Sequence, residues 1–387
     1  MTQPDPIVDR PPDRAPRTLL ITEWWLPTIG GSVNYYVNTY ERYPAGSVQV
    51  LTGDTDAAKP GSTSGLPTTR VSLRRYRFLR PESLALYVRM LRAADRLITQ
   101  ADIEVIHCGH VFSEGMVAWI LNRRRAIPYV VYAHGEEVAI QRRYAAKRWW
   151  MPRIYNGAAA VIANSQNTRE LLEQVGVDRS RIHVINPGVD AQRFCAVPRQ
   201  PDGCFRLLSV GRLQLRKGHD NVIRAVAALG ESCPDLVYDI AGTGEERSKL
   251  EELARTLGVE QRVRFLGAVA NTDLPALYAS CDVFVLANRQ LADDDLEGFG
   301  MVFLEAAACG RAVLGGNTGG TADAVAHERN GLLVDASCQD TLTGTIRRLH
   351  DDPELRERLA AEGPGFARAG FDWDDISRKI RGLAAHA

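Results

Sequence analysis

The sequence predicts an α/β protein with two Rossmann-like, doubly wound domains, and three observations support this class. The chain has 387 residues, which is too long for one ordinary hydrophobic core and favours two domains of roughly 150–200 residues. Short β-rich runs alternate with amphipathic stretches, a pattern typical of βαβ units and parallel sheets. The alternation starts afresh after residues 196–203, where Pro198, Pro201 and Gly203 predict a linker.

Each half of the chain is expected to supply one sheet. The first half should contain strands at residues 18–23, 48–52, 105–107, 129–133, 159–163 and 183–185, with a helix at 81–99. The second half should contain strands at 205–210, 236–241, 263–266, 283–287, 312–315 and 331–334, with a helix at 220–229. Residues 1–17 are polar and rich in proline, so we expect a disordered tail, followed by a first domain at 18–198 and a second at 199–370.

The composition narrows the class of protein. It is 45% hydrophobic and 24% charged, as in globular proteins, and no apolar run approaches the ~20 residues of a membrane span. The seven cysteines are scattered without a C-x-x-C pair, which argues against a zinc site and favours the reducing cytoplasm. Residues 1–198 hold 25 Lys and Arg against 18 Asp and Glu. The first domain should therefore favour an anionic partner, and the acidic second half should not.

Two glycine pairs follow predicted strands. Ligands of doubly wound sheets bind at the carboxyl ends of the strands, and two such domains would form a cleft for them. Gly30 and Gly31 follow the first strand and precede a helix, whose free N–H groups could hold a phosphate. Gly242 and Gly244 follow a later strand but stop short of a full dinucleotide fingerprint. A tight turn without a ligand explains either pair as well.

Cations stand directly after the first strand of the second half, in the segment 208–218. Arg212 and Lys217 could bind a diphosphate, whose charge grows as its bond to a sugar breaks. The alternative is a solvated basic turn, and this is the expectation for Arg216. No P-loop sequence is present.

The segment 293–310 is the most informative. Glu297 and Glu305 stand about two helical turns apart, but Gly298 and Gly300 predict a loop around the first of them. Glu305 then lies one turn into an apolar helix, where a carboxylate is unfavourable unless a partner uses it. A ribose diol is a suitable partner, and the helix start at residues 300–302 offers N–H groups to a phosphate.

This segment resembles the E-x7-E signature of retaining GT-B glycosyltransferases of family 4. Further landmarks occur in the order expected for that family: Gly30-Gly31, His134-Gly135-x-Glu137, Asn164-Ser165, Pro187-Gly188-Val189-Asp190, Arg212 with Lys217, Gly242-x-Gly244, and Gly319-Gly320. The similarity spans about residue 18 to the C-terminus. Among members of the family, it is greatest to phosphatidylinositol-mannoside-type mannosyltransferases. The implied fold is GT-B, with a C-terminal helix at 371–387 crossing back to the first domain and hinges at 198–203 and 371–373.

The resemblance also implies roles. Arg212 and Lys217 would hold the donor diphosphate, Gly31 would approach it, and Glu305 would bind the ribose. Glu297 would hold sugar hydroxyls, and His134 would lie near the anomeric carbon and the C6 hydroxyl. The expected catalytic residues are thus His134, Glu297, Arg212 and Lys217. The expected donor-binding residues are Gly30, Gly31, Arg212, Lys217, Gly242, Gly244, Ala268, Val269, Glu297, Phe299, Gly300, Met301, Val302 and Glu305.

Other residues invite metal or acceptor interpretations. Asp293 and Asp295 match a metal-binding D-x-D, but a solvated loop is the simpler interpretation, and we expect neither a metal nor a cofactor beyond the nucleotide-sugar. His107 is expected in the core, and His110 is expected to line the cleft. The basic stretches 74–80 and 141–150 carry aromatic residues. They could contact an anionic membrane that carries a lipid-linked acceptor. The alternative, which we expect, is a helix with tryptophans inward and solvated arginines.

The resulting hypothesis is a hexosyltransferase that uses GDP-mannose or a UDP-sugar, with an anionic or lipid-linked acceptor. No nucleic acid partner is expected, because no recognition fold is visible. Contact with the inner face of the cell membrane stays open. The rival hypotheses are a non-hydrolysing sugar-nucleotide epimerase on the same fold, a pyridoxal-phosphate-dependent phosphorylase, and a two-lobed sugar-binding protein.

Overall fold

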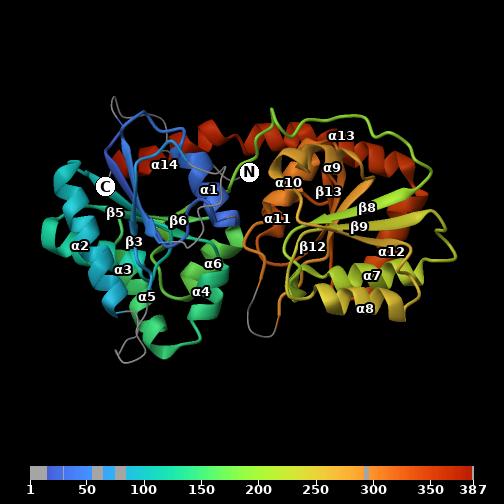
Figure 1. Ribbon diagram of the computed structural model, residues 1–387, viewed down its shortest axis with the longest axis horizontal. Coiled ribbons are helices and arrows are strands. Elements are labelled where there is room, and N and C mark those ends of the chain that lie inside the picture. The colour runs from blue at the N-terminus through green and yellow to red at the C-terminus, as the bar shows by residue number, and fades with distance from the viewer. Residues whose placement is uncertain (1–14, 29, 55–63, 75–83, 292–295, 386–387) are drawn as a thin grey trace. The chain divides into compact units, whose positions relative to one another are not determined.

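The computed structural model describes residues 15–28, 30–54, 64–74, 84–291 and 296–385. The chain divides into two compact units, which are both visible in Figure 1. Unit 1 comprises Met1–Pro187 with Trp373–Ala387, and unit 2 comprises Gly188–Asp372. The first crossing thus falls before the predicted linker, and the chain returns to unit 1 at Trp373.

Unit 1 contains a seven-stranded sheet of order β3-β2-β1-β4-β5-β6-β7. All paired strands are parallel. The strands are β1 (Thr18–Thr22), β2 (Val48–Gly53), β3 (Thr68–Val71), β4 (Val105–Cys108), β5 (Tyr129–Ala133), β6 (Ala160–Ala163) and β7 (Ile182–Val184). The helices are α1 (Gly31–Tyr40), α2 (Leu84–Gln100), α3 (Glu114–Arg125), α4 (Glu136–Gln141), α5 (Ala145–Gly157), α6 (Gln166–Gln174), α14 (Trp373–Ala385) and the short 3₁₀ turn η1 (Arg179–Arg181).

Unit 2 contains a six-stranded parallel sheet of order β10-β9-β8-β11-β12-β13. The strands are β8 (Phe205–Val210), β9 (Leu236–Ala241), β10 (Val263–Gly267), β11 (Val283–Leu286), β12 (Ala312–Gly316) and β13 (Gly331–Val334). The helices are α7 (His219–Ala228), α8 (Arg247–Thr256), α9 (Leu274–Ala279), α10 (Met301–Ala308), α11 (Thr321–Ala324), α12 (Gln339–Asp351), α13 (Pro353–Gly370) and the 3₁₀ turns η2 (Leu215–Lys217) and η3 (Asn271–Asp273).

Both sheets are doubly wound, which confirms the predicted fold class. In each unit the chain order reverses beside the first strand, at β1/β4 and at β8/β11. Such a reversal point is where α/β sheets bind ligands, outside the carboxyl ends of the strands.

The sheet of unit 2 carries a hydrophobic core on each face. Neighbouring residues of β8 point to opposite faces, so Leu207 packs with α7, α8 and α12, while Leu208 packs with α9 and α10. Figure 1 shows these two helix layers on either side of the sheet. Strands buried on both faces read as continuous apolar runs, and for this reason their positions were predictable.

The strand β3 was not predicted. Its residues alternate between exposed and half-buried, and it lies at the edge of the sheet, so the sequence there lacks an apolar run. The other twelve strands lie within one or two residues of the predicted ranges. The predicted tail at 1–17 lies almost wholly outside the described residues.

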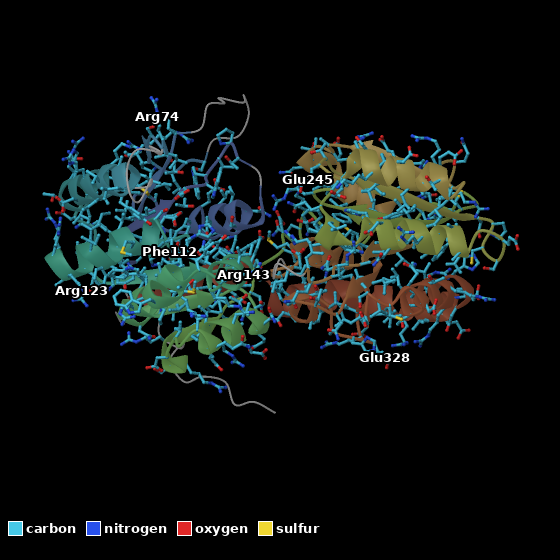
Figure 2. All side chains as sticks on the ribbon, turned by 90° about the horizontal axis from the view of Figure 1, so that it is seen from below. Arg74, Phe112, Arg123, Arg143, Glu245 and Glu328 are labelled. Atoms are coloured by element: carbon cyan, nitrogen blue, oxygen red, sulfur yellow. The ribbon has the colours of Figure 1, made fainter. Side chains whose placement is uncertain are left out.

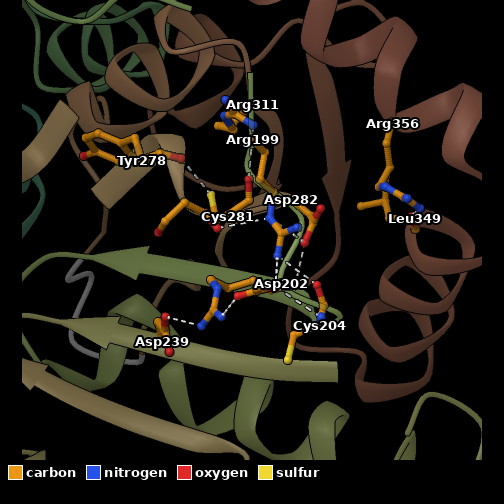
Figure 3. A network of polar contacts seen from close by, with 12 residues as sticks. Arg199, Asp202, Cys204, Asp239, Tyr278, Cys281, Asp282, Arg311, Leu349 and Arg356 are labelled. Atoms are coloured by element: carbon orange, nitrogen blue, oxygen red, sulfur yellow. Dashed lines mark hydrogen bonds and ion pairs between the residues drawn. The ribbon is translucent and has the colours of Figure 1, made fainter. Parts of the chain in front are cut away.

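The predicted linker is tied to unit 2 by a network of ion pairs and hydrogen bonds, drawn in Figure 3. Arg199 bonds to Asp202 at 2.7 Å and pairs with Asp282 at 3.3 Å. Arg206 pairs with Asp202 and, at 2.9 Å, with the buried Asp239. These contacts hold residues 199–206 to unit 2, which begins at Gly188, so the boundary between the units lies before the predicted linker. The segments that enter and leave unit 2 bond to each other, Val189 N–H to the Phe371 carbonyl at 2.9 Å.

Two global expectations concern the whole chain. All seven cysteines are free thiols, as expected. Among the described residues, no helix is both long and apolar enough to cross a membrane.

Candidate active site

The cationic turn of unit 2 lies at the reversal point between β8 and β11. The 3₁₀ turn η2 carries Arg216 and Lys217 and ends at Gly218, which has a φ of +68°. A Cβ at Gly218 would clash with the Ala287 carbonyl just after β11, so the turn packs directly on the neighbouring strand. The Arg289 N–H also donates to the Arg216 carbonyl at 2.9 Å. Backbone contacts therefore fix where these cations stand.

Both cations of this turn converge on Glu297. The Arg216 Nη1 lies 2.8 Å from Glu297 Oε2, and the Lys217 Nζ donates to the same oxygen. All three residues are buried. The expectation of a solvated Arg216 is therefore wrong, because the turn points this side chain inward. Arg212, in contrast, is exposed.

Burial and the neighbouring charges set the ionisation of this cluster. Burial alone would raise the pKa of Glu297, but Lys217 and Arg216 outweigh it and lower that pKa below its usual value. Burial lowers the pKa of the Lys217 ammonium, which Glu297 partly counteracts. The turn carries Arg216 and Lys217 side by side, and the exposed Arg212 adds a third positive charge nearby. The turn is therefore suited to bind an anion.

The loop that carries Glu297 is fixed by the glycine pair after β12. Gly320 N–H donates to the Glu297 carbonyl at 2.8 Å. Gly319 has a φ of +58°, and a Cβ there would clash with the same carbonyl oxygen. Gly300 has a φ of +94° and caps α10, which begins at Met301. The loop thus leads from Glu297 to the N-terminus of α10, where the helix dipole favours an anion.

The remaining residues of the E-x7-E segment differ in burial. Phe299 is buried in the core of unit 2, whereas Met301 and Val302 are half-buried at the start of α10. Glu305 is half-buried one turn later and accepts a hydrogen bond from the Tyr278 hydroxyl at 2.6 Å. Burial raises the pKa of Glu305, opposed by this bond and by Arg193. Tyr278, which the sequence did not indicate, therefore positions the second carboxylate.

The glycine pair after β9 has a structural explanation. Gly242 has a φ of +145°, and a Cβ there would clash with the Gly211 carbonyl. A Cβ at Gly244 would lie 2.6 Å from the Leu213 nitrogen. The turns after β8 and β9 thus pack together at the carboxyl edge. After β10, Ala268 is exposed and Val269 half-buried at the same edge.

The glycine pair of unit 1 lies at the start of α1. Gly30 and Gly31 are exposed, and α1 begins at Gly31. Gly30 has an extended backbone, with a φ of 178°, and a Cβ there would meet no atom within 4 Å. Neither conformation nor packing in unit 1 requires glycine at this position, which leaves open space next to a helix N-terminus.

His134 follows β5 and is held at three points. Its backbone N–H donates to Glu137 Oε1 at 2.7 Å, and its carbonyl accepts from Asn164 Nδ2 at 3.1 Å. Its ring Nε2 lies 2.5 Å from the Tyr36 hydroxyl. Two of these contacts come from the H-G-x-E and N-S motifs, which explains why these motifs occur together. The third comes from α1.

The Tyr36 contact also fixes the protonation of the ring. Tyr36 donates its single hydroxyl proton to the Gly109 carbonyl at 2.8 Å. The contact with His134 then requires the Nε2–H of the ring to donate. Burial, with a contribution from His110, lowers the pKa of His134 to about 3. Neutral His134 therefore keeps a lone pair on Nδ1 that can accept a hydrogen bond.

The neighbouring His110 has the opposite ionisation. Its ring centroid lies 5.3 Å from that of His134, and its Nδ1 lies 3.6 Å from the buried Glu114. Burial would lower the pKa of His110, but Glu114, Glu137 and Glu23 outweigh it and raise that pKa to about 9. Unit 1 thus places one neutral and one charged imidazole side by side, a pattern typical of functional sites.

Comparisons with known proteins bear on this arrangement. Residues 192–366 match the family described as Glycosyl transferases group 1, and residues 29–193 match Glycosyltransferase Family 4. The GDP-mannose-dependent alpha-(1-6)-phosphatidylinositol monomannoside mannosyltransferase of Mycobacterium tuberculosis is 30% identical over 74% of this chain and 76% of the relative. The chain belongs to glycosyltransferase family 4.

Other relatives of this glycosyltransferase agree with the assignment. The D-inositol 3-phosphate glycosyltransferase of Salinispora tropica is 31% identical over 76% of this chain and 66% of the relative. The structure of Anabaena HepE in complex with UDP and glucose has a TM-score of 0.78 at 22% identity, covering 94% of this chain and 98% of HepE. Sucrose-phosphate synthase from Thermosynechococcus elongatus has a TM-score of 0.80 at 23% identity, covering 94% of this chain and 96% of that protein. These structures share the GT-B fold, which confirms the second part of the fold prediction.

The glycosyltransferase also contains residues that the metal interpretation had singled out. His107 is buried and bonds to the Tyr40 hydroxyl at 2.6 Å, as expected for a core residue. Asp293 and Asp295 lie outside the described residues. His110 lies at the carboxyl edge, next to His134.

Proposed function

We propose that this glycosyltransferase moves a mannosyl residue from GDP-mannose to an acceptor hydroxyl and retains the configuration of the anomeric carbon. The observation that carries the proposal is the buried cluster in unit 2, where Arg216 and Lys217 both bond to Glu297. Cations fixed at the carboxyl end of a strand suit an anion, and a nucleoside diphosphate is the anion that a sugar donor provides.

The cluster suits the leaving group of such a reaction. Negative charge grows on the diphosphate as its bond to the sugar breaks, and fixed cations stabilise that charge without reorganising. Lys217 and Arg212 are the proposed diphosphate ligands. Because these cations can do the work of a divalent metal, we propose that transfer requires no metal and no cofactor beyond the nucleotide-sugar.

Glu305 is the proposed ribose ligand. Tyr278 bonds to one carboxylate oxygen of Glu305, Oε2. The other oxygen can accept a ribose hydroxyl, and the half-burial of the residue keeps it within reach of a ligand.

The carboxylates also bear on the stereochemistry. Glu297 bonds to two cations and Glu305 to a tyrosine, so both serve as binding groups and neither is presented as a nucleophile. We therefore infer front-face attack, in which the leaving phosphate helps to deprotonate the acceptor. His134 is proposed to accept a hydrogen bond from the C6 hydroxyl of the donor sugar through Nδ1.

The relatives guide the choice of substrates. The mycobacterial relative is named for GDP-mannose and for a phosphatidylinositol lipid. The Salinispora relative is named for inositol 3-phosphate. We propose an acceptor of the same chemistry, a phosphate-bearing polyol or its lipid-linked form.

A ligand screen followed by one assay tests the proposal. Thermal unfolding is measured with GDP-mannose, UDP-glucose, UDP-N-acetylglucosamine and ADP-glucose, since a specific ligand stabilises the fold by mass action. GDP-mannose should give the largest shift. Transfer to an inositol phosphate is then followed by NMR, with and without EDTA. The one-bond C1–H1 coupling of the product should show the same anomeric configuration as the donor. Loss of transfer in EDTA would overturn metal independence, and an inverted anomer would overturn retention.

A further inference from the structure

A surface of unit 1 combines cations with aromatic rings on two helices, α3 and α5. Its core, which we call the basic-aromatic face, comprises Trp119, Arg123, Arg148, Trp149, Trp150 and Arg153. Figure 2 labels Arg123 on this unit, together with Phe112 and Arg143. None of these side chains has a role in the site described above.

Stacked rings and guanidinium groups join the two helices. Arg123 lies 4.4 Å from the centroid of Trp119, whose ring meets Trp150 of α5 at 5.5 Å. Trp150 in turn meets Trp149 at 4.8 Å, and Arg153 lies 3.6 Å from the Trp149 centroid. The contacts form a continuous ladder with an arginine at each end, held by aromatic and cation–π contacts.

The ladder reaches the surface. Trp149 is 52% exposed and the neighbouring Tyr144 is 59% exposed. The prediction that both tryptophans of this segment face inward is therefore wrong for Trp149. Trp149 and Tyr144 thus place exposed aromatic rings beside the cations of this surface.

Three cations of this surface, Arg143, Arg148 and Arg153, lie without a paired carboxylate among the described residues. Residues 142–153 contain five Lys or Arg and no acidic residue. Beside the face, Arg142, Arg143 and Arg148 line a hollow of about 420 Å³ together with Gln174. This surface can accept several negative charges.

Arg142, beside this surface, lies one short helix away from His134 in the sequence. The helix α4, Glu136–Gln141, is the only element between His134 and Arg142 in the sequence. Its six residues span about 9 Å at the rise of an α-helix.

We propose that this surface binds the anionic face of a lipid bilayer. Exposed tryptophans flanked by arginines suit the headgroup region, where the rings enter the interface and the guanidinium groups meet phosphates. The complete lack of carboxylates in the segment matches a uniformly negative partner better than a protein surface of mixed charge. The inference stands apart from the proposed function, because binding to a bilayer requires neither donor nor turnover.

Vesicle sedimentation tests the inference with the full-length protein. Vesicles contain phosphatidylcholine alone or an equal mixture of phosphatidylcholine and phosphatidylglycerol. We expect the protein to sediment with the mixed vesicles and to stay in solution with the neutral ones. Added salt should release it, because the attraction between surface charges is screened.

Variants locate the binding surface. Arg143→Gln with Arg148→Gln should weaken binding about 25-fold, at about fivefold per cation near an anionic bilayer. Trp149→Ser should weaken binding in a manner that salt changes little. The matched control is Arg92→Gln with Arg96→Gln, which removes the same charge from exposed positions of α2 and should bind as the unmodified protein does. Melting temperatures of all variants check that each is folded.

Four results would overturn the proposal. They are equal loss of binding in the α2 control, unchanged binding in the Arg143/Arg148 variant, binding to double-stranded DNA without binding to vesicles, and a dimer that Trp149→Ser dissociates without any vesicle binding.

Discussion

The carboxyl edges of the two sheets share one topology and differ in chemistry. In unit 2, the edge carries Arg216 and Lys217, which share the carboxylate of Glu297, in a backbone fixed by glycine contacts. In unit 1, the edge carries His134 and His110 beside Tyr36, and carboxylates tune their ionisation. The edge of unit 2 therefore holds charged side chains in fixed positions, whereas the edge of unit 1 determines the protonation of two imidazole rings.

The two sheets place their turns at equivalent points, and the side chains of those turns decide what each edge can bind. Both sheets reverse their strand order beside the first strand, so both place their following turns at equivalent points. What differs is the residues of those turns. A site must therefore be argued from its own side chains, since the same fold serves unrelated purposes.

The largest effect is expected from the cationic turn. Lys217→Ala should lower kcat/KM for transfer about a thousandfold, because a buried cation that stabilises the leaving group is lost. The matched control is Lys249→Ala on α8, whose side chain is 74% exposed. Steady-state kinetics of both variants, with melting temperatures to show folding, check the prediction. A fully active Lys217→Ala enzyme would refute the assignment of this turn.

The second prediction separates the buried arginine of this turn from the exposed one. Arg216→Met should lower the free energy of unfolding by about 3 kcal/mol, because it removes one partner from a buried ion pair. Arg212→Met should change it by less than about 0.5 kcal/mol, as for other surface positions, while raising KM for the donor. Urea unfolding measures both. Equal stability of the two variants would contradict the buried pairing.

The third prediction concerns pH and tests the edge of unit 1. The pKa of His110 is raised from 6.5 to about 9 in the folded protein. Its contribution to stability is then fully present below pH 6.5 and is lost as pH rises to 9. After a discount for its 25% exposed side chain, we expect a loss of about 2 kcal/mol. Urea unfolding at both pH values measures it, with His110→Gln as the control that should lose this slope. Equal slopes in the two proteins would show that His110 is not the group responsible.

The smallest effect is expected from the hydroxyl that fixes the His134 ring. Tyr36→Phe should lower kcat about tenfold, because His134 loses the acceptor for its Nε2–H and both tautomers become accessible. Nitrogen NMR of His134 should show the mixture directly. Tyr40→Phe is the matched control on the same helix, since its hydroxyl bonds to the core residue His107. That variant should lose stability without a change in kcat, and an equal loss of kcat would assign Tyr36 a merely structural role.

The sequence predicted the strands and the turns after them, because local residue patterns determine both. Apolar runs located all strands buried on both faces, and glycine and charge patterns located the turns after them. The failures share a cause. Arg216 and Tyr278 acquire their roles from partners 81 and 27 residues away, Glu297 and Glu305, and no local pattern encodes such a pairing. The edge strand β3 and the outward ring of Trp149 were missed for the opposite reason, because exposure leaves no apolar pattern to detect.

The sequence by itself determined the two doubly wound sheets, the order of their turns and the E-x7-E segment, since these depend on periodicity and on residue types at short range. Only the tertiary structure decided that Glu297 unites two buried cations, that Tyr36 sets the tautomer of His134, and that α3 and α5 join their tryptophans into one surface. Each of these depends on distances between segments far apart in the chain, and those distances exist only once burial of the apolar strands has brought the segments together.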